Sequence, residues 1–240
     1  MKKTLTILTL ALLVWSTTGF SQDRSYRFGM HVSPNISWIK PEVEGLAYEG
    51  DGSMIGVSYG AIFENYFTPN VAFITGLSIL HTGGHLKYPF IVTTLDGAGI
   101  SVRDTGSLMR KYNLQYIEIP IMLKGSTGEL LGDFSFYGQF GIGSGFNVKA
   151  KARDEFASDK GTESVITENK NVKKDVSFFR ETLIIGIGAE YALGSTAIAF
   201  AGLSFSNGFT DALTSEASYN PAIKEKARVN CVELNIGIVF

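Results

Sequence analysis

The sequence of 240 residues contains one cysteine, Cys231, and few charged residues, which make up 18% of the chain. A single cysteine excludes an internal disulfide framework and a cysteine-based zinc site. Acidic residues slightly outnumber basic ones, and the formal net charge is −2. Because nucleic-acid-binding domains are usually basic, we expect no nucleic-acid partner. No apolar run reaches about 18 residues, which excludes a membrane-spanning helix.

The N-terminal segment has the features of a secretory signal peptide. Two lysines precede a mostly apolar run over residues 5–15, and Gly19 and Ser21 supply small residues at the −3 and −1 positions of a cleavage site. This arrangement predicts that residues 1–21 are removed and that residues 22–240 form one exported domain. No cysteine lies directly after the apolar run, so the signal is not that of a lipoprotein.

The remaining sequence alternates apolar and polar residues between turn residues, which predicts β-strands. We expect strands near 25–38, 55–67, 71–87, 112–126, 134–149, 177–191, 196–209 and 229–240. Short connections alternate with long polar ones, near 39–54, 88–111, 150–176 and 210–228. Outer-membrane barrels have short periplasmic turns, longer extracellular loops and an even number of strands. We therefore predict an all-β fold, an eight-stranded antiparallel up-and-down transmembrane β-barrel with both termini periplasmic.

Each predicted strand has one apolar face and one polar face. In the last strand, Leu234 and Ile236 share a face, and Glu233 lies on the other. A shift of one residue would exchange the faces, and a basic residue at the bilayer midplane costs about 2–4 kcal/mol. The apolar faces are therefore expected to contact lipid. Aromatic residues near both strand ends are expected to form girdles at the membrane interfaces, although aromatics favour strands in any case. The girdle near the long loops would contain Trp38, Tyr59, Tyr112, Phe146, Phe178 and Phe205.

The polar faces carry nine ionisable residues that we expect inside the barrel. The set consists of Arg27, His31, Glu64, Glu118, Lys124, Lys149, Arg180, Glu190 and Glu233. The lumen of an eight-stranded barrel is just wide enough for side chains to fill it, and an unpaired buried charge is costly. Four acids, four bases and one histidine therefore predict a nearly neutral ion-pair network that plugs the lumen. A narrow path for small solutes through this network is the alternative.

The sequence offers no motif for a catalytic, cofactor or metal site. His81 and His85 would lie about 13 Å apart on a strand, too far to share one metal ion unless the chain turns at residues 83–84. Some outer-membrane barrels modify lipids, and His31 or His81 could serve such chemistry, but no nucleophile motif accompanies them. We therefore expect a non-enzymatic protein without a cofactor. The charged segment 150–176 is expected to be a solvated loop or a hairpin extended from the sheet; the alternative is a contact site for lipopolysaccharide, divalent ions or a protein.

Five segments resemble the PorT family of outer-membrane β-barrel proteins. They are residues 28–37, 76–83, 114–124 and 186–191 and the terminal strand that ends at Phe240. The resemblance covers essentially the whole chain after residue 21, and it implies an OmpA/OmpX-like barrel in the outer membrane of a Gram-negative cell. The founding member of the family is linked to a protein-secretion system. The implied partners are outer-membrane lipids and lipopolysaccharide, the barrel-assembly machinery that reads the last strand, and a secretion-system or surface protein that contacts the loops.

Overall fold

The structure, a computed structural model, describes residues 25–41, 49–95, 101–128, 132–159, 163–194, 196–213, 216–217, 220–224 and 226–240. The expected signal peptide at 1–21 lies outside these residues. Among the described residues, no helix is long and apolar enough to cross a membrane.

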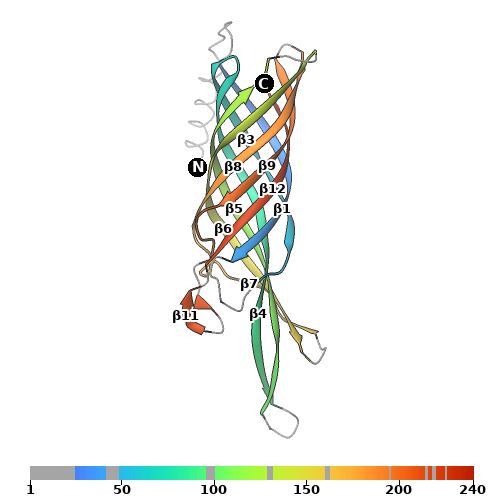
Figure 1. Cartoon of the computed structure of the whole chain (residues 1–240), viewed down its shortest axis with the longest axis vertical. Helices are drawn as coiled ribbons and strands as arrows, with labels where there is room; N and C mark the ends of the chain where they lie inside the picture. The colour runs from blue at the N-terminus through green and yellow to red at the C-terminus, as the bar shows by residue number, and fades with distance from the viewer. Residues whose placement is uncertain are drawn as a thin grey trace, which may run out of the picture.

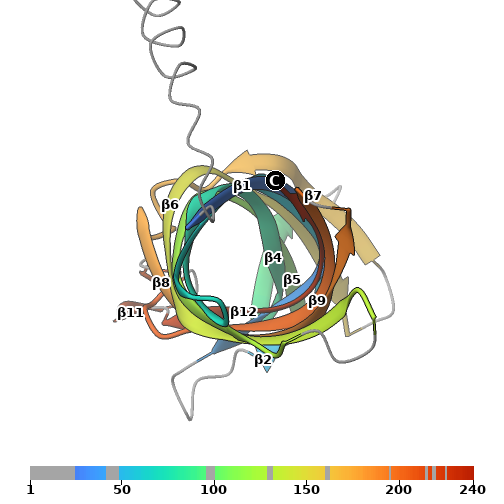
Figure 2. The same cartoon turned by 90° about the horizontal axis from the view of Figure 1, so that it is seen from above.

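Eight long strands form a closed antiparallel ring (Figure 2). They are β1 (Tyr26–Pro41), β3 (Ser53–Thr68), β4 (Val71–Leu95), β5 (Ser101–Ser126), β6 (Phe134–Ser158), β8 (Phe179–Leu193), β9 (Ala197–Gly208) and β12 (Ala227–Val239). Strands adjacent along the ring pair, β4 also pairs with β5, and the pairing of β1 with β12 closes the ring. The prediction of an eight-stranded barrel is confirmed.

Four shorter strands accompany the ring. They are β2 (Glu49–Gly50), β7 (Glu163–Asn171), β10 (Glu216–Ala217) and β11 (Asn220–Lys224). Strand β2 pairs with β4, β7 pairs with β6, and β10 and β11 form a separate two-stranded sheet. The segment 150–176 is therefore largely the outer part of a β6–β7 hairpin, one of the two arrangements expected for it.

The segment 88–111 was expected to be a long polar loop, and this prediction was wrong. Strands β4 and β5 stay paired from the barrel to Leu95 and Ser101, and the hairpin protrudes at the bottom of Figure 1. Ladder pairing uses backbone groups, so it tolerates polar side chains on both faces, and the β-branched run over 91–94 favours an extended chain. The strands were missed because the whole segment was treated as polar, although residues 88–92 are largely apolar.

The described chain begins and finishes at the side of the barrel that carries the short turns. The amide of Phe240 donates to the carbonyl of Phe28 at 2.7 Å, next to the end of β3. Gly132 and Gly194 have φ angles of 63° and 84° in two of these turns, a conformation that glycine adopts without steric cost. The long hairpins lie at the opposite end (Figure 1).

The predicted faces are confirmed for β5, β8 and β12. Ile119, Ile185 and Ile236 are 36%, 53% and 50% exposed on the outside. Glu118 and Glu190, on the opposite faces, are 8% and 6% exposed. The ring therefore presents an apolar band outward and keeps its charges inward, as a barrel surrounded by lipid requires.

The aromatic residues follow this pattern at the short-turn end, where the exposed rings are Tyr26, Phe28, Phe67, Phe134, Phe136, Tyr191 and Phe240. At the other end Tyr59, Phe178 and Phe205 are exposed, but Tyr112 is 0% exposed. Its assignment to the girdle was wrong, because an even position on β5 shares the inward face with Glu118. Tyr112 lies inside the mouth of the barrel.

Candidate functional site in the barrel lumen

A buried lysine organises the lumen near the short turns. Lys124 Nζ lies 2.5 Å from Glu64 Oε1 and 2.7 Å from Glu190 Oε1. Tyr66 Oη donates to the other oxygen of Glu64 at 2.7 Å and accepts from Arg27 at 2.9 Å. Two cations thus face two carboxylates, with the tyrosine hydroxyl between them. Close charge pairing of this kind offsets the cost of burying ionised groups.

A hydrogen-bond network around His31 occupies the next layer. His31 contacts Ser33 Oγ at 3.0 Å through Nδ1 and Ser78 Oγ at 2.9 Å through Nε2. Ser33 donates its only proton to Asn235 Oδ1, and Asn235 donates in turn to Ser204. Because a hydroxyl has one proton, Ser33 accepts from His31, and we assign the donor role to His31 Nδ1. His31 is thereby hydrogen-bonded through both of its ring nitrogens.

A second buried ion pair lies closer to the long loops. Arg180 is 1% exposed, and its Nη2 donates to Glu118 Oε2 at 2.8 Å. The guanidinium lies 4.8 Å from the ring centre of Tyr116, a cation–π contact. Glu233 is also buried, and no ion pair of its carboxylate is found among the described residues. This layer contains one more carboxylate than cation.

A cavity of about 80 Å³ connects these layers. Its polar lining includes His31, Glu64, Glu118, Lys124, Gln139, Glu190, Glu233 and Asn235. A water molecule needs roughly 10–15 Å³ of such volume. The cavity therefore has room for several water molecules that can hydrate the carboxylates.

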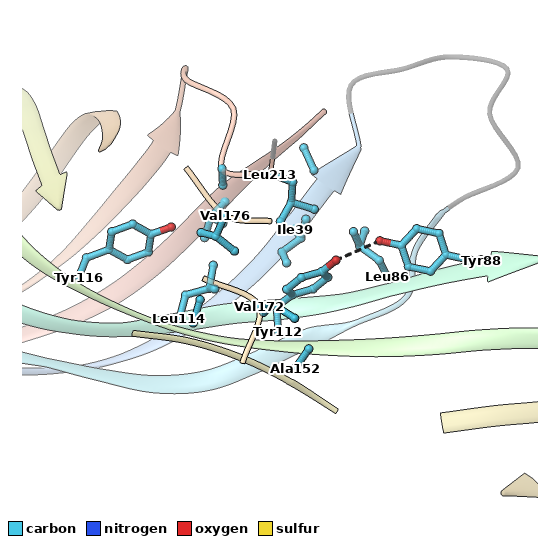
Figure 3. Close-up of a cluster of buried hydrophobic side chains, with 14 of the residues drawn as sticks. Ile39, Leu86, Tyr88, Tyr112, Leu114, Tyr116, Ala152, Val172, Val176 and Leu213 are labelled. Atoms are coloured by element: carbon cyan, nitrogen blue, oxygen red, sulfur yellow. Dashed lines mark hydrogen bonds between the residues drawn. The ribbon is translucent and has the colours of Figure 1, made fainter. Parts of the chain in front are cut away.

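The lumen near the long loops has the opposite chemistry. A buried apolar cluster fills it, including Ile39, Leu86, Tyr88, Tyr112, Leu114, Tyr116, Val172, Val176 and Leu213 (Figure 3). Val172 and Val176 lie between β7 and β8, and Leu213 follows β9. A bridge between Val176 and Leu213 joins the two segments, and the amide of Ser177 donates to the carbonyl of Ala212 at 2.9 Å. These segments contribute side chains to the apolar cluster at the mouth of the barrel.

A third buried ion pair accompanies this cluster. Arg110 Nε and Nη2 donate to the two carboxylate oxygens of Asp154 at 2.6 and 2.8 Å. The guanidinium lies 6.0 Å from the ring centre of Tyr88, whose hydroxyl lies 3.3 Å from that of Tyr112. Bidentate pairs combine strength with fixed geometry. Sequence reasoning missed this pair because Arg110 and Asp154 were assigned to loops.

One of the nine predicted lumen residues lies elsewhere. Lys149 is exposed on the outside of the barrel. Gln115 pairs with Lys149 and Tyr116 with Asn147, so Val148 has no partner on β5 and forms a β-bulge. A bulge adds one residue and breaks the alternation of faces, which turns Lys149 outward. The other eight lie along the lumen in the layers described above, so four carboxylates there face three cations.

The two histidines on β4 do not converge. Strand β4 continues without a turn through residues 83–84, and the ring of His81 stacks on Tyr59 at 6.2 Å. Among the described residues, no group of three or more histidine, cysteine or acidic side chains could hold a metal ion.

The family of the chain follows from its sequence together with this ring. Residues 20–214 match the family described as outer membrane protein beta-barrel domain. The chain belongs to this family. This membership agrees with the outward apolar band. The chain is therefore an integral protein of the outer membrane.

The solved structures to which the chain is similar include outer-membrane proteins of low sequence identity. Neisserial surface protein A is 13% identical, with 88% of this chain and 95% of that chain covered and a TM-score of 0.43. Ail of Yersinia pestis is 12% identical, with 90% and 99% covered and a TM-score of 0.35. The barrel domain of OprF from Pseudomonas aeruginosa is 12% identical, with 88% and 97% covered and a TM-score of 0.34. No curated protein matches the sequence.

Proposed function

We propose that the chain is a non-enzymatic outer-membrane protein with a closed lumen, which contacts other molecules through its long hairpins. In this proposal the short-turn end and both chain termini face the periplasm, and the β4–β5 and β6–β7 hairpins extend from the cell. The observation that carries the proposal is the sequence of layers in the lumen, in which ion-paired layers lie beneath an apolar mouth.

The closed lumen argues against steady ion flow. Leu86 and Tyr112 are 0% exposed, and Val172 and Leu213 are 1% exposed. An aqueous path would require this apolar cluster to separate. It would also have to pass Lys124, which is 2% exposed and held by two carboxylates.

The hairpins support the second half of the proposal. Strands β4 and β5 contain 25 and 26 residues, whereas a strand needs only about 9–11 residues to cross a bilayer. More than half of each strand is therefore available outside the membrane. Loops and hairpins at this end of a barrel commonly carry recognition.

Planar-bilayer conductance tests the closed lumen. We expect no steady channels from the refolded protein, and channels from a V172D/V176D variant, whose charges would hydrate the mouth. The matched control is Ile91→Asp, which places an acid on the exposed β4–β5 hairpin and should leave the bilayer silent. Steady channels from the wild-type protein would overturn the closed lumen and favour a small-solute pore, the alternative that the cavity of about 80 Å³ supports.

The proposed partners are those that the PorT resemblance implies. Outer-membrane lipids and lipopolysaccharide would surround the band, the barrel-assembly machinery would bind the last strand during insertion, and a secretion-system or surface protein would contact the hairpins. Cross-linking from the β4–β5 hairpin in intact cells should capture a protein that a hairpin-shortened chain does not. Lipid turnover that disappears on substitution of His31 or His81 would contradict the non-enzymatic proposal and favour an outer-membrane lipid-modifying enzyme.

A further inference from the structure

A cluster of three lysines lies on the outer surface of the barrel, at the end with the long hairpins. Lys111 belongs to β5, and Lys149 and Lys151 belong to β6. They line a surface pocket of about 390 Å³, together with His81, Gln115 and Asn169. Leu114 of the lumen cluster also borders this pocket, but none of the three lysines belongs to the lumen layers described above.

The strand register brings the lysines close together. Lys149 pairs with Gln115, Lys151 with Asn113, and Lys111 with Arg153. Lys149 and Lys151 are therefore about 7 Å apart along one face of β6. Lys111 is the diagonal neighbour of Lys151, at a comparable distance. The bulge at Val148 creates this arrangement, because without it Lys149 would point into the lumen.

Among the described side chains, none of the three lysines forms an ion pair. Arg153, which pairs with Lys111 on the adjacent strand, has its own carboxylate, Glu155, at 2.7 Å. Like charges on adjacent strand positions repel, so an anion supplied from outside the chain would relieve a repulsion that the fold itself maintains.

The surroundings of the pocket indicate what carries this anion. Ile55, which lines the pocket, is 82% exposed, and Val148, next to Lys149, is 39% exposed. On β5, Ile117 follows Gln115 on the same outward face and begins the apolar band. The ring pair of Tyr59 and His81 lies at the same level, where aromatic rings meet headgroups. The lysines thus lie where hydrocarbon gives way to headgroups.

We propose that Lys111, Lys149 and Lys151 bind the phosphate of an outer-leaflet lipid, whose acyl chains lie along the apolar band. Lysine binds phosphate as a point charge, and a basic group at a membrane surface attracts anionic lipid. A soluble anion would use the charges but would leave the exposed isoleucine and valine uncovered. The inference rests on the proposed orientation, with the hairpin end outward.

The test uses the full chain, refolded in an uncharged maltoside detergent, with short-chain phosphatidic acid as the probe. We expect saturable shifts of the backbone amide resonances of Asn113, Gln115 and Lys151. A K111Q/K149Q/K151Q variant should bind about 100-fold more weakly at low salt, since each surface lysine contributes about a fivefold effect. The matched control is K40Q/K173Q/K174Q, which removes the same charge from exposed positions away from β5 and the Lys149–Lys151 part of β6 and should bind as the wild type does.

Three results would overturn the lipid site. They are equal affinity of the two triple variants, equal shifts with short-chain phosphatidylcholine, and competition by inorganic phosphate at the concentration of the lipid. The last result would indicate a site for a soluble anion. Each variant is first checked for the gel-mobility shift on heating that a closed barrel shows. Loss of that shift in the wild type would contradict the proposed membrane barrel, whereas a folded barrel without lipid binding would contradict only this inference.

Discussion

The lumen near the short turns and the lumen near the long loops are filled by side chains of opposite chemistry. At the first end Lys124 lies between Glu64 and Glu190, and at the second end Tyr112 and Leu213 pack in an apolar cluster. Both ends use the same inward positions of the strands, so the alternation of faces does not decide the chemistry. A buried charge must keep its partner, whereas an apolar cluster needs only close packing. The two ends should therefore respond differently when one group is removed.

The largest effect is expected from Lys124→Met. This change leaves two buried carboxylates next to each other without the ammonium that pairs them, and breaking a buried pair in this way costs about 3–5 kcal/mol. Urea unfolding of the barrel in lipid vesicles, followed by tryptophan fluorescence, measures the loss. A variant that also carries E64Q and E190Q should recover most of it, because no unpaired charge remains. Wild-type stability of the single variant would show that the ion pairs do not hold this end together.

A smaller loss is expected from Leu213→Ala at the apolar end. The side chain is 1% exposed, and truncation of a buried leucine costs about 2–5 kcal/mol, less where the surroundings can collapse. Leu213 lies on a segment between strands, so we expect a value at the lower end of this range. The matched control is Leu203→Ala, because Leu203 is 55% exposed on the lipid face and should lose little. Equal losses in the two variants would contradict a packed mouth.

The polar end of the lumen was largely predictable from the sequence, and the reason is visible in β5. Glu118 and Lys124 differ by an even number of residues, and Ile119 and Ile121 occupy the alternate positions. Charged residues that are separated by an even number of positions lie on the same face of a strand. This face must point inward if the other, apolar face meets lipid. The pairing of Lys124 with Glu64 across the barrel could not be predicted, because it depends on the stagger between strands that are not adjacent in sequence.

The position of Lys149 shows where alternation fails. The bulge at Val148 reverses the faces of β6 beyond Asn147, and the three residues from Asn147 to Lys149 include no proline or glycine that would mark it. One unmarked extra residue therefore moved a cation from the expected lumen network to the outer surface. The same bulge left the lumen with an excess of carboxylates.

The apolar mouth was missed for a different reason. Val172, Val176 and Leu213 lie in segments that are otherwise polar, and no strand periodicity surrounds them. The available signal was a few isolated apolar residues, near the end of the predicted loop 150–176 and near the start of the predicted loop 210–228. Their meaning depends on the loops folding back over the ring, which local sequence does not specify.

The smallest effect is expected from Glu155→Gln, which changes an exposed acid next to a buried one. Asp154 and Glu155 are consecutive on β6, and each accepts from an arginine, at 2.6 and 2.7 Å respectively. Glu155 is 44% exposed in its side chain, against 6% for Asp154. Exposed ion pairs contribute about 0–1 kcal/mol and are screened by salt, so Glu155→Gln should change the free energy of unfolding by no more than this and by less at high salt. Asp154→Asn, its matched contrast, leaves Arg110 buried without a carboxylate and should cost several times more at either salt concentration. Equal costs for the two variants would mean that burial does not set the strength of these pairs, and the difference between the two ends of the lumen would then need another cause.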